Sequence, residues 1–329
     1  MKDTADIRKV NLYKIRKILW KGEWKTKQQL AAETSLSVAS CNTFLNELSN
    51  SGEVISEKTR IHEVGPGALK FRINENYESI LCMWFDLCDH QELLNIRILA
   101  PTGSILYEEQ QKYDVLTPEK VMLAAETMFE RFRNISMIMV GTPSIAENGV
   151  IRHCDIPSLE NYGIVDELSE KFPVPVYLEN DMHFKVFGYS KKYCNDTDVV
   201  TLAYFPAHIL PGTATVHQGM VIKGNNQFAG MVGFLPSNLS REEYLDKLQV
   251  GTCREIISKA ITSIISILNP GTVVLTGNLL DETCTKWVSE DCSRWIPESY
   301  LPEFIYQRNI EEYYIEGMYQ KALELKGVV

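Results

Sequence analysis

Apolar positions recur with a helical period at the start of the chain. Across residues 10–19 they fall near every third or fourth position and stop before Gly22, which predicts a first helix. Thr26 and Gln29 have the spacing of a capping box, in which a threonine side chain and a glutamine three residues later satisfy the first free amides. They predict a second helix that ends near Thr34.

A third helix and a hairpin follow. Ser37 can cap a helix that stops near Gly52, and its inward positions are apolar: Cys41, Phe44, Leu45 and Leu48. Residues 53–60 and 68–75 then alternate apolar and polar side chains on either side of a Gly-Pro-Gly turn, as two paired strands do. Three short helices followed by a strand pair predict a winged helix-turn-helix.

This motif places its third helix in the DNA major groove, while flanking cations bind phosphates. We expect the groove face to consist of Ser37, Val38, Ala39, Asn42, Thr43 and Asn46. We expect the phosphate contacts among Lys25, Lys27, Lys58, Arg60, Lys70 and Arg72. The groove face has no arginine or lysine for reading guanine, so a protein-interaction module remains an alternative.

From about residue 79 onward, the pattern changes to apolar strands that alternate with helices. Strands are predicted within residues 80–113, 135–145 and 174–181, and helices at 117–133 and 164–172. The scheme then repeats, with a strand at 198–205, a helical region at 240–268 that Gly251 interrupts, a strand near 269–280 and a last helix at 308–326. The sequence therefore predicts two α/β lobes behind the helical head.

Charge separates the head from these lobes. Residues 1–75 contain 13 Lys and Arg against 9 Asp and Glu, a net charge of +4, whereas the whole chain of 329 residues has a net charge of −10. A basic head suits nucleic acid.

The charged first residues and the lack of a long apolar run predict a cytoplasmic protein. The eight cysteines are scattered along the chain, which predicts neither disulfides nor a thiolate metal site.

Four segments resemble one known family. VGPGALKFRINENY, VPVYLENDMHFKVFGY, VIKGNNQFAGMVGFLP and NPGTVVLTGNLL are similar to segments of the ROK family of bacterial sugar-responsive repressors and sugar kinases. The resemblance implies an α/β chain in which a winged helix-turn-helix at 1–76 precedes a two-lobed actin-like (ribonuclease H-like) ATPase fold. We expect one lobe at 77–190, completed by the last helix at 308–329, and the other at 191–307.

Both ATP-phosphate segments of the family depart from its pattern here. DLCDHQ at 86–91 stands where the family has Asp-x-Gly-Gly-Thr, and the carboxylate of Asp89 would repel a phosphate. FPAHILPGTATV at 205–216 replaces a glycine-rich run, and Pro206 and Pro211 have no amide to donate. We therefore expect no phosphoryl transfer, no catalytic residue and no cofactor.

The sugar and zinc segment has changed too. Met231 and Phe234 replace the family's sugar-binding glutamate and zinc-binding histidine, and residues 236–244 lack cysteine, so we expect no metal. Asn180 and Asp181 match the family's sugar-binding pair. They either bind a small ligand, with Asn226 as a further candidate, or only cap the following helix.

We therefore expect a transcriptional regulator, a repressor, whose silent body forms a homodimer or tetramer and senses a small molecule such as a sugar. Its other partner would be a roughly palindromic DNA operator. The alternatives are a divergent sugar kinase with Asp181 as its base, and a pseudokinase that binds proteins.

Overall fold

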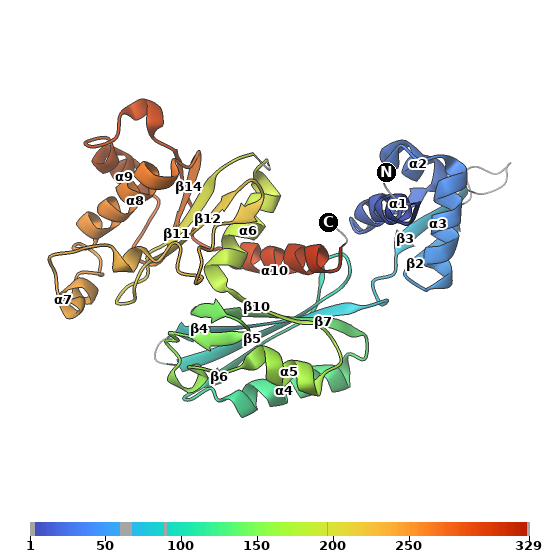
Figure 1. Cartoon of the computed structure of the whole chain (residues 1–329), viewed down its shortest axis with the longest axis horizontal. Coiled ribbons are helices and arrows are strands. Elements are labelled where there is room, and N and C mark those ends of the chain that lie inside the picture. The colour runs from blue at the N-terminus through green and yellow to red at the C-terminus, as the bar shows by residue number, and fades with distance from the viewer. Residues whose placement is uncertain (1–3, 60–67, 89–90, 196, 328–329) are drawn as a thin grey trace. The chain divides into compact units, whose positions relative to one another are not determined.

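The structure is a computed structural model that describes residues 4–59, 68–88, 91–195 and 197–327 (Figure 1). Contacts divide the chain into two units. The first comprises residues 1–140, 166–177 and 319–329, and the second comprises residues 141–165 and 178–318. The domain boundaries expected at 76, 190 and 307 remain a prediction.

The head contains the predicted helices. They are α1 (Thr4–Leu19), α2 (Lys27–Thr34) and α3 (Val38–Asn50). The capping box of Thr26 and Gln29 forms at the start of α2, and the Ser37 side chain accepts from the Ser40 amide at the start of α3. The predicted inner face of α3 is buried and packs with Ile15 and Leu19 of α1 and Leu30 of α2 in one apolar cluster.

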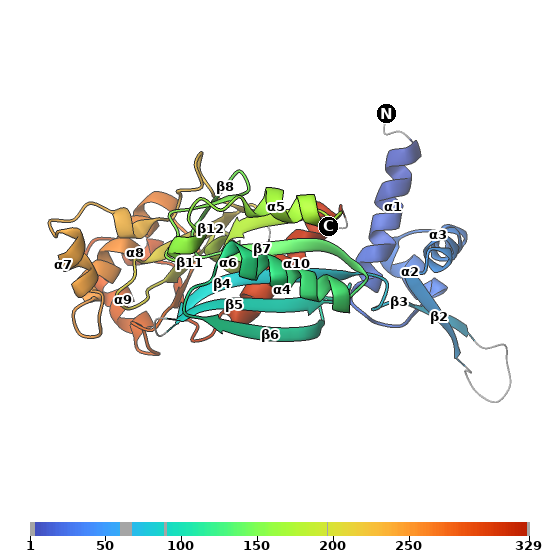
Figure 2. The same cartoon turned by 90° about the horizontal axis from the view of Figure 1, so that it is seen from below.

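The predicted strand pair follows these helices. Strands β2 (Val54–Thr59) and β3 (Ala68–Ile73) pair antiparallel, and the two-residue strand β1 (Lys25–Thr26) adds to β3, so that the sheet order is β1-β3-β2. Figure 2 shows β2 and β3 side by side next to α2 and α3. The Gly-Pro-Gly turn itself lies outside the described residues.

A five-stranded sheet follows, in the order β10-β7-β4-β5-β6. Its strands are β4 (Ser79–Cys88), β5 (Gln91–Leu99), β6 (Ile105–Tyr113), β7 (Ile135–Thr142) and β10 (Val176–Asn180). Helices α4 (Pro118–Arg131) and α5 (Ile164–Lys171) lie together on one side of it (Figure 1). The stacked rings of Phe129 and Phe172, 4.1 Å apart, join α4 to the residues after α5. A small hairpin of β8 (Ile145–Glu147) and β9 (Val150–Arg152) precedes α5.

The second sheet repeats the order of the first. It runs β13-β12-β11-β14-β15, so in both sheets three consecutive antiparallel strands are followed on the other side by two later strands. Its strands are β11 (Val200–Tyr204), β12 (Gly212–His217), β13 (Met220–Val221), β14 (Thr272–Thr276) and β15 (Glu303–Tyr306). The predicted repetition of the α/β scheme is confirmed.

Helices cover both faces of this sheet. On one face, α6 (Asp181–Tyr193) and the start of α10 (Glu311–Leu325) pack on β11, β12 and β14. On the other face, α8 (Arg254–Leu268) and α9 (Cys284–Cys292) pack on β11 and β14. Because both faces are covered, the central strands β11 and β14 are almost wholly buried.

The helical region predicted at 240–268 is two helices, α7 (Arg241–Asp246) and α8, and Gly251 lies between them with a φ of 95°. Among the described elements, β12, α9 and β15 were not predicted, and neither were the short strands β1, β8, β9 and β13. In the part of the chain that the structure describes, no helix has the length and hydropathy of a membrane span.

Candidate functional site

The predicted groove face lies on the outside of α3. Val38, Ala39, Thr43 and Asn46 are exposed, and Val38 has 45% of its surface accessible although it is apolar. Ser37 is exposed as well and caps the helix. These exposed side chains are small and uncharged, so the N-terminal half of α3 could approach base edges without a charge to desolvate.

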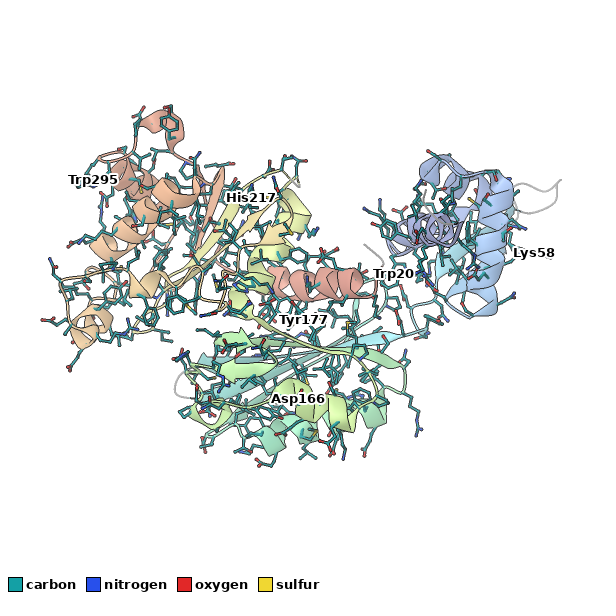
Figure 3. The ribbon with its side chains drawn as sticks, viewed as in Figure 1. Trp20, Lys58, Asp166, Tyr177, His217 and Trp295 are labelled. Atoms are coloured by element: carbon teal, nitrogen blue, oxygen red, sulfur yellow. The ribbon has the colours of Figure 1, made fainter. Side chains whose placement is uncertain are left out.

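The cations predicted to bind phosphates differ in how exposed they are and in whether carboxylates already pair with them. Lys58 is exposed on β2, at the outer edge of the head (Figure 3). The Lys25 side chain is only 17% exposed, and its ammonium lies 2.9 Å from carboxylate oxygens of both Glu23 and Glu33. Arg60 lies outside the described residues. Lys58 is therefore better placed than Lys25 to meet a phosphate.

Two further cations of the head contact neighbouring side chains, and a third is partly buried. Lys27 donates to the Oδ1 atom of Asn42, so this side-chain amide of the predicted groove face is held by a neighbouring lysine. The Arg72 guanidinium lies 5.3 Å from the ring centre of Trp24, and Lys70 is partly buried on β3. DNA would have to compete with the contact between Lys27 and Asn42.

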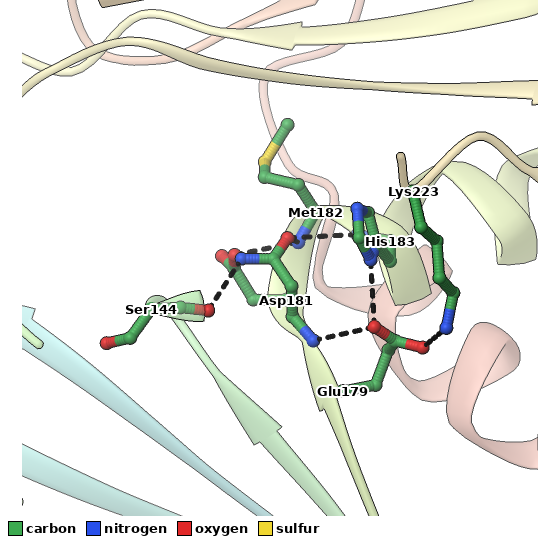
Figure 4. Close-up of polar contacts among 7 residues, drawn as sticks. Ser144, Glu179, Asp181, Met182, His183 and Lys223 are labelled. Atoms are coloured by element: carbon green, nitrogen blue, oxygen red, sulfur yellow. Dashed lines mark hydrogen bonds and ion pairs between the residues drawn. The ribbon is translucent and has the colours of Figure 1, made fainter. Parts of the chain in front are cut away.

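In the body, Asn180 caps helix α6, and its partners Ser144, Met182 and His183 are labelled in Figure 4. Its Oδ1 atom accepts from the amides of Met182 at 2.9 Å and His183 at 3.3 Å, and its side-chain nitrogen donates to the Ser144 carbonyl at 3.0 Å. Both ends of the buried amide thus have partners inside the protein. This geometry supports the capping role that the sequence left open.

Asp181 is also occupied. One carboxylate oxygen accepts from the Met182 amide at 2.7 Å, and the other lies 2.5 Å from the ammonium of Lys185, one helical turn later. Both side chains are buried, and the lysine also lies 4.9 Å from the ring centre of Tyr314. A carboxylate that is paired in this way is a poor proton acceptor for a substrate hydroxyl, because accepting the proton would break the ion pair.

A second buried pairing lies two residues before Asp181. The Glu179 carboxylate receives the ammonium of Lys223 on one oxygen, and its other oxygen lies 2.8 Å from Nδ1 of His183 (Figure 4). Burial raises the pKa of this carboxyl, but the hydrogen bonds and charges of His183 and Lys223 outweigh burial and lower it to about 2. Glu179 is therefore a fixed negative charge at neutral pH.

Helical spacing could have revealed part of this network from the sequence. Asp181 and Lys185 are four residues apart on α6, which is the distance at which side chains meet on a helix, whereas Glu179 lies on β10 and so meets His183 outside this pattern. No local pattern links Lys223 to Glu179, because the two are 44 residues apart. Lys223 follows β13, and the packing of β13 against α6 brings this lysine close to Glu179.

The Gly-Asn-Asn loop lies beyond this network. Asn226 is exposed, and the next residue, Gln227, has a positive φ of 59°, as is usual in a tight turn. The structure places Asn226 in no contact with Asn180 or Asp181 among the described hydrogen bonds. Its ligand role stays a prediction.

The glycine-containing segment at 228–235 has a structural use. Gly230 has a φ of 90°, and a Cβ atom there would lie 1.9 Å from the Thr213 carbonyl oxygen. The Thr213 amide in turn donates to the Gly230 carbonyl at 2.9 Å. Only glycine allows the segment to lie this close to β12.

The loop at 205–211, where the family has a phosphate-binding run, uses its amides internally. Ala207 donates to Oδ1 of Asn278 at 2.7 Å, and His208 donates to the Leu248 carbonyl at 2.9 Å. Pro206 and Pro211 have no amide hydrogen. This loop therefore has few donors left for a phosphate.

Asp86, in the other phosphate segment, is anchored as well. Its Oδ2 atom accepts from Trp84 at 3.0 Å and from Asn95 at 2.9 Å. The residues after it, 89–90, lie outside the described residues. Among the residues that are described, no group of three or more histidines, cysteines and acids is placed to hold a metal ion.

Comparisons with known proteins agree with this architecture. Residues 102–255 match the model of the ROK family, and no curated protein sequence matches the chain. The structure is similar to that of a ROK family transcriptional regulator, a homologue of the E. coli MLC protein, with a TM-score of 0.70, 15% identity, and coverage of 98% of this chain and 99% of that one.

Two other ROK structures match a smaller share of this chain. The ROK hexokinase from Thermus thermophilus is 18% identical with a TM-score of 0.58, and a ROK family protein from Streptococcus pneumoniae TIGR4 in complex with sucrose is 14% identical with a TM-score of 0.61. Each covers 76% of this chain and 99% of its own. The likeness confirms the predicted α/β, actin-like fold, and residues 102–255 of the chain are similar to the ROK family.

Proposed function

We propose that this chain is a DNA-binding transcriptional regulator, a repressor, whose ROK body transfers no phosphate. The observation that carries the proposal is the outer face of α3. It is exposed, it is made of small uncharged side chains, and it lies next to a strand pair that presents Lys58. A helix with such a face can enter a major groove while the strand pair meets the backbone.

The electrostatics of the head support this proposal. Most of its described carboxylates are held by cations: Glu47 by Arg8 at 2.5 Å, Glu53 by Arg16 at 2.6 Å, and Glu23 and Glu33 by Lys25 at 2.9 Å. Acids that are paired in this way repel DNA less than free ones. The net charge of +4 is therefore available to attract phosphates.

The coverage of the known folds points the same way. The regulator structure covers 98% of the chain, whereas the hexokinase structure covers 76% and leaves about a quarter unmatched. That quarter is close to the size of the predicted head at residues 1–76. A kinase has no need of such a head, but a regulator requires one.

A divergent sugar kinase is the second candidate, because ROK kinases share the fold of the body. The pairing of Asp181 with Lys185 and the occupied amides of the 205–211 loop argue against it. A coupled assay of nucleotide release over a panel of sugars separates the two candidates. Turnover that Asp181→Asn abolishes would establish the kinase.

For DNA binding itself, the test is a matched pair of substitutions. Asn46→Glu places a negative charge on the groove face of α3, and Asn238→Glu makes the same change at an exposed position of the body. On DNA from upstream of the gene, we expect Asn46→Glu to weaken binding at least about tenfold, a typical cost of one lost base contact. We expect Asn238→Glu to bind as the wild type does.

Equal binding by both variants would reject α3 as the reading helix. If the wild type also binds no DNA, the head is better explained as a module that binds proteins.

We propose further that the body pairs two copies, so that the operator is roughly palindromic.

A further inference from the structure

A cavity of about 310 Å³ lies within the second unit, beside the glycine-containing segment. One wall is the segment itself, with Phe228 and Met231. The opposite wall is the last turns of α8, with Ile264 and Ile267, and β12 supplies Thr213 and Thr215. The family resemblance assigns a sugar contact to the position of Met231, but the wall here is mainly hydrocarbon.

The hydroxyl groups in these walls already have partners. Thr213 Oγ1 donates to the Gly230 carbonyl at 3.0 Å, and Thr215 Oγ1 lies 2.8 Å from Oγ1 of Thr201. The Ser263 hydroxyl donates to the Lys259 carbonyl at 2.8 Å. A sugar would find these hydroxyls engaged and would lose its hydration without replacement, which is costly.

Backbone donors in the walls are engaged too. The Ile222 amide donates to the Thr215 carbonyl at 2.8 Å, the Ala229 amide to the Lys223 carbonyl at 3.2 Å, and the Val232 amide to the Gly230 carbonyl at 2.8 Å. The cavity therefore offers shape and dispersion contacts rather than hydrogen bonds. Such a surface favours an apolar ligand.

Local packing holds the cavity in shape. Gly230 locks the segment against β12, as described above, and the rings of Phe228 and Phe234 meet edge to face 5.2 Å apart. The Arg241 guanidinium lies 4.6 Å from the ring centre of Phe234 and donates to the Gly233 carbonyl at 3.0 Å. A preformed wall reduces the ordering cost of binding.

We propose that this cavity binds a small uncharged apolar molecule about the size of a two-ring aromatic compound. A dry cavity of roughly 150 Å³ is enough to bind benzene, and this one has about twice that volume. Binding of such a molecule does not depend on the proposed function. If the head binds DNA, the molecule is a candidate effector.

The test uses the neutral naphthalene dye Prodan as the probe and two serines of α8 as a matched pair. The hydroxyls of Ser263 and Ser266 each bond to the carbonyl four residues earlier, at 2.8 Å, but only Ser263 lines the cavity. Ser263→Phe fills the cavity with a ring, whereas Ser266→Phe places the same ring on the exposed side of the helix.

We expect the wild type and Ser266→Phe to bind Prodan saturably at one site with a blue-shifted emission. We expect Ser263→Phe to bind at least tenfold more weakly. If Ser263→Phe does not fold, Ile267→Glu replaces it, because Ile267 is 76% exposed and its substitution leaves the core intact.

Equal binding by all variants, or no saturable binding by the wild type, would overturn the proposal. A third outcome is binding that appears only on dilution, together with dissociation of a dimer in sedimentation velocity. That result would mean that a second copy of the chain covers the cavity, and it also rejects the small-molecule proposal. None of these outcomes depends on DNA.

Discussion

Replacement of Lys223 by methionine tests the buried network at the start of α6. The substitution removes the ammonium from Glu179 but keeps most of the side-chain volume. Glu179 is 4% exposed, so water replaces the lost ammonium poorly, and the other carboxylate oxygen keeps His183 Nδ1 at 2.8 Å and the Asn180 amide at 3.1 Å. The variant must bury a carboxylate that has lost much of its compensation.

The cost follows from the exposure of the two partners. Removing one member of a fully buried pair costs about 3–5 kcal/mol. Lys223 is 31% exposed and His183 still donates, so we expect about 2 kcal/mol, which corresponds to about 30-fold faster opening of the surrounding structure. Hydrogen exchange of peptides from α6, followed by mass spectrometry at pH 7, measures this change directly.

The pH dependence has a definite sign. A carboxyl whose pKa is lowered from 4.5 to about 2 stabilises the folded state above its unfolded pKa, and this contribution is lost as the pH falls through about 2. In Lys223→Met the pKa of Glu179 rises, because burial is opposed by fewer charges. The difference in stability between variant and wild type should therefore shrink as the pH falls below 4.5.

The control for Lys223→Met is the double variant with Glu179→Gln. Because glutamine carries no charge, the double variant should exchange within about threefold of the Glu179→Gln single variant, which corresponds to less than about 0.7 kcal/mol. Unchanged exchange in Lys223→Met would refute the reasoning. The reasoning would also be refuted if Lys223→Met destabilised the Glu179→Gln variant as much as it destabilises the wild type, because the ion pair would then contribute nothing to stability.

Two further substitutions test the packing. Gly230→Ala should destabilise the second unit by at least about 3 kcal/mol, because the new methyl group would lie 1.9 Å from the Thr213 carbonyl oxygen and the φ of residue 230 is positive. A thermal unfolding midpoint within about a degree of the wild type would contradict this expectation. Arg16→Ala should destabilise the head by about 2 kcal/mol, because it removes both hydrogen bonds, at 2.6 and 2.7 Å, from the buried carboxylate of Glu53. Arg8→Ala breaks an exposed ion pair and should cost less than about 1 kcal/mol. Hydrogen-exchange rates of β2 compare the two variants, and equal effects would argue against the role of burial.

Local signals predicted the head well. The capping box at Thr26 and the cap at Ser37 form in the structure because each uses atoms only three residues apart. The buried face of α3 follows from helical spacing alone. Such short-range physics can be read from one sequence, and the same holds for the break near Gly251.

Elements whose packing partners are distant in the sequence were not predicted. Helix α9 contains acids and a tryptophan but few aliphatic residues. It forms because its buried face packs into the apolar cluster around α8 and because Asp291 accepts a hydrogen bond from Arg254 at 2.7 Å. Strand β15 is short and lies at an edge, where its parallel partner β14 defines it. Sequence alone also could not show that the side-chain nitrogen of Asn180 is engaged, since its partner, the Ser144 carbonyl, lies 36 residues earlier in the chain.

The central claim is that the head reads DNA, and one titration tests it most directly. Fluorescence anisotropy would compare DNA from upstream of the gene with a scrambled duplex of equal length, at two salt concentrations. The account predicts binding that is at least about a thousandfold tighter to the upstream DNA and that weakens as salt rises. Equal, weak binding to both duplexes would contradict it.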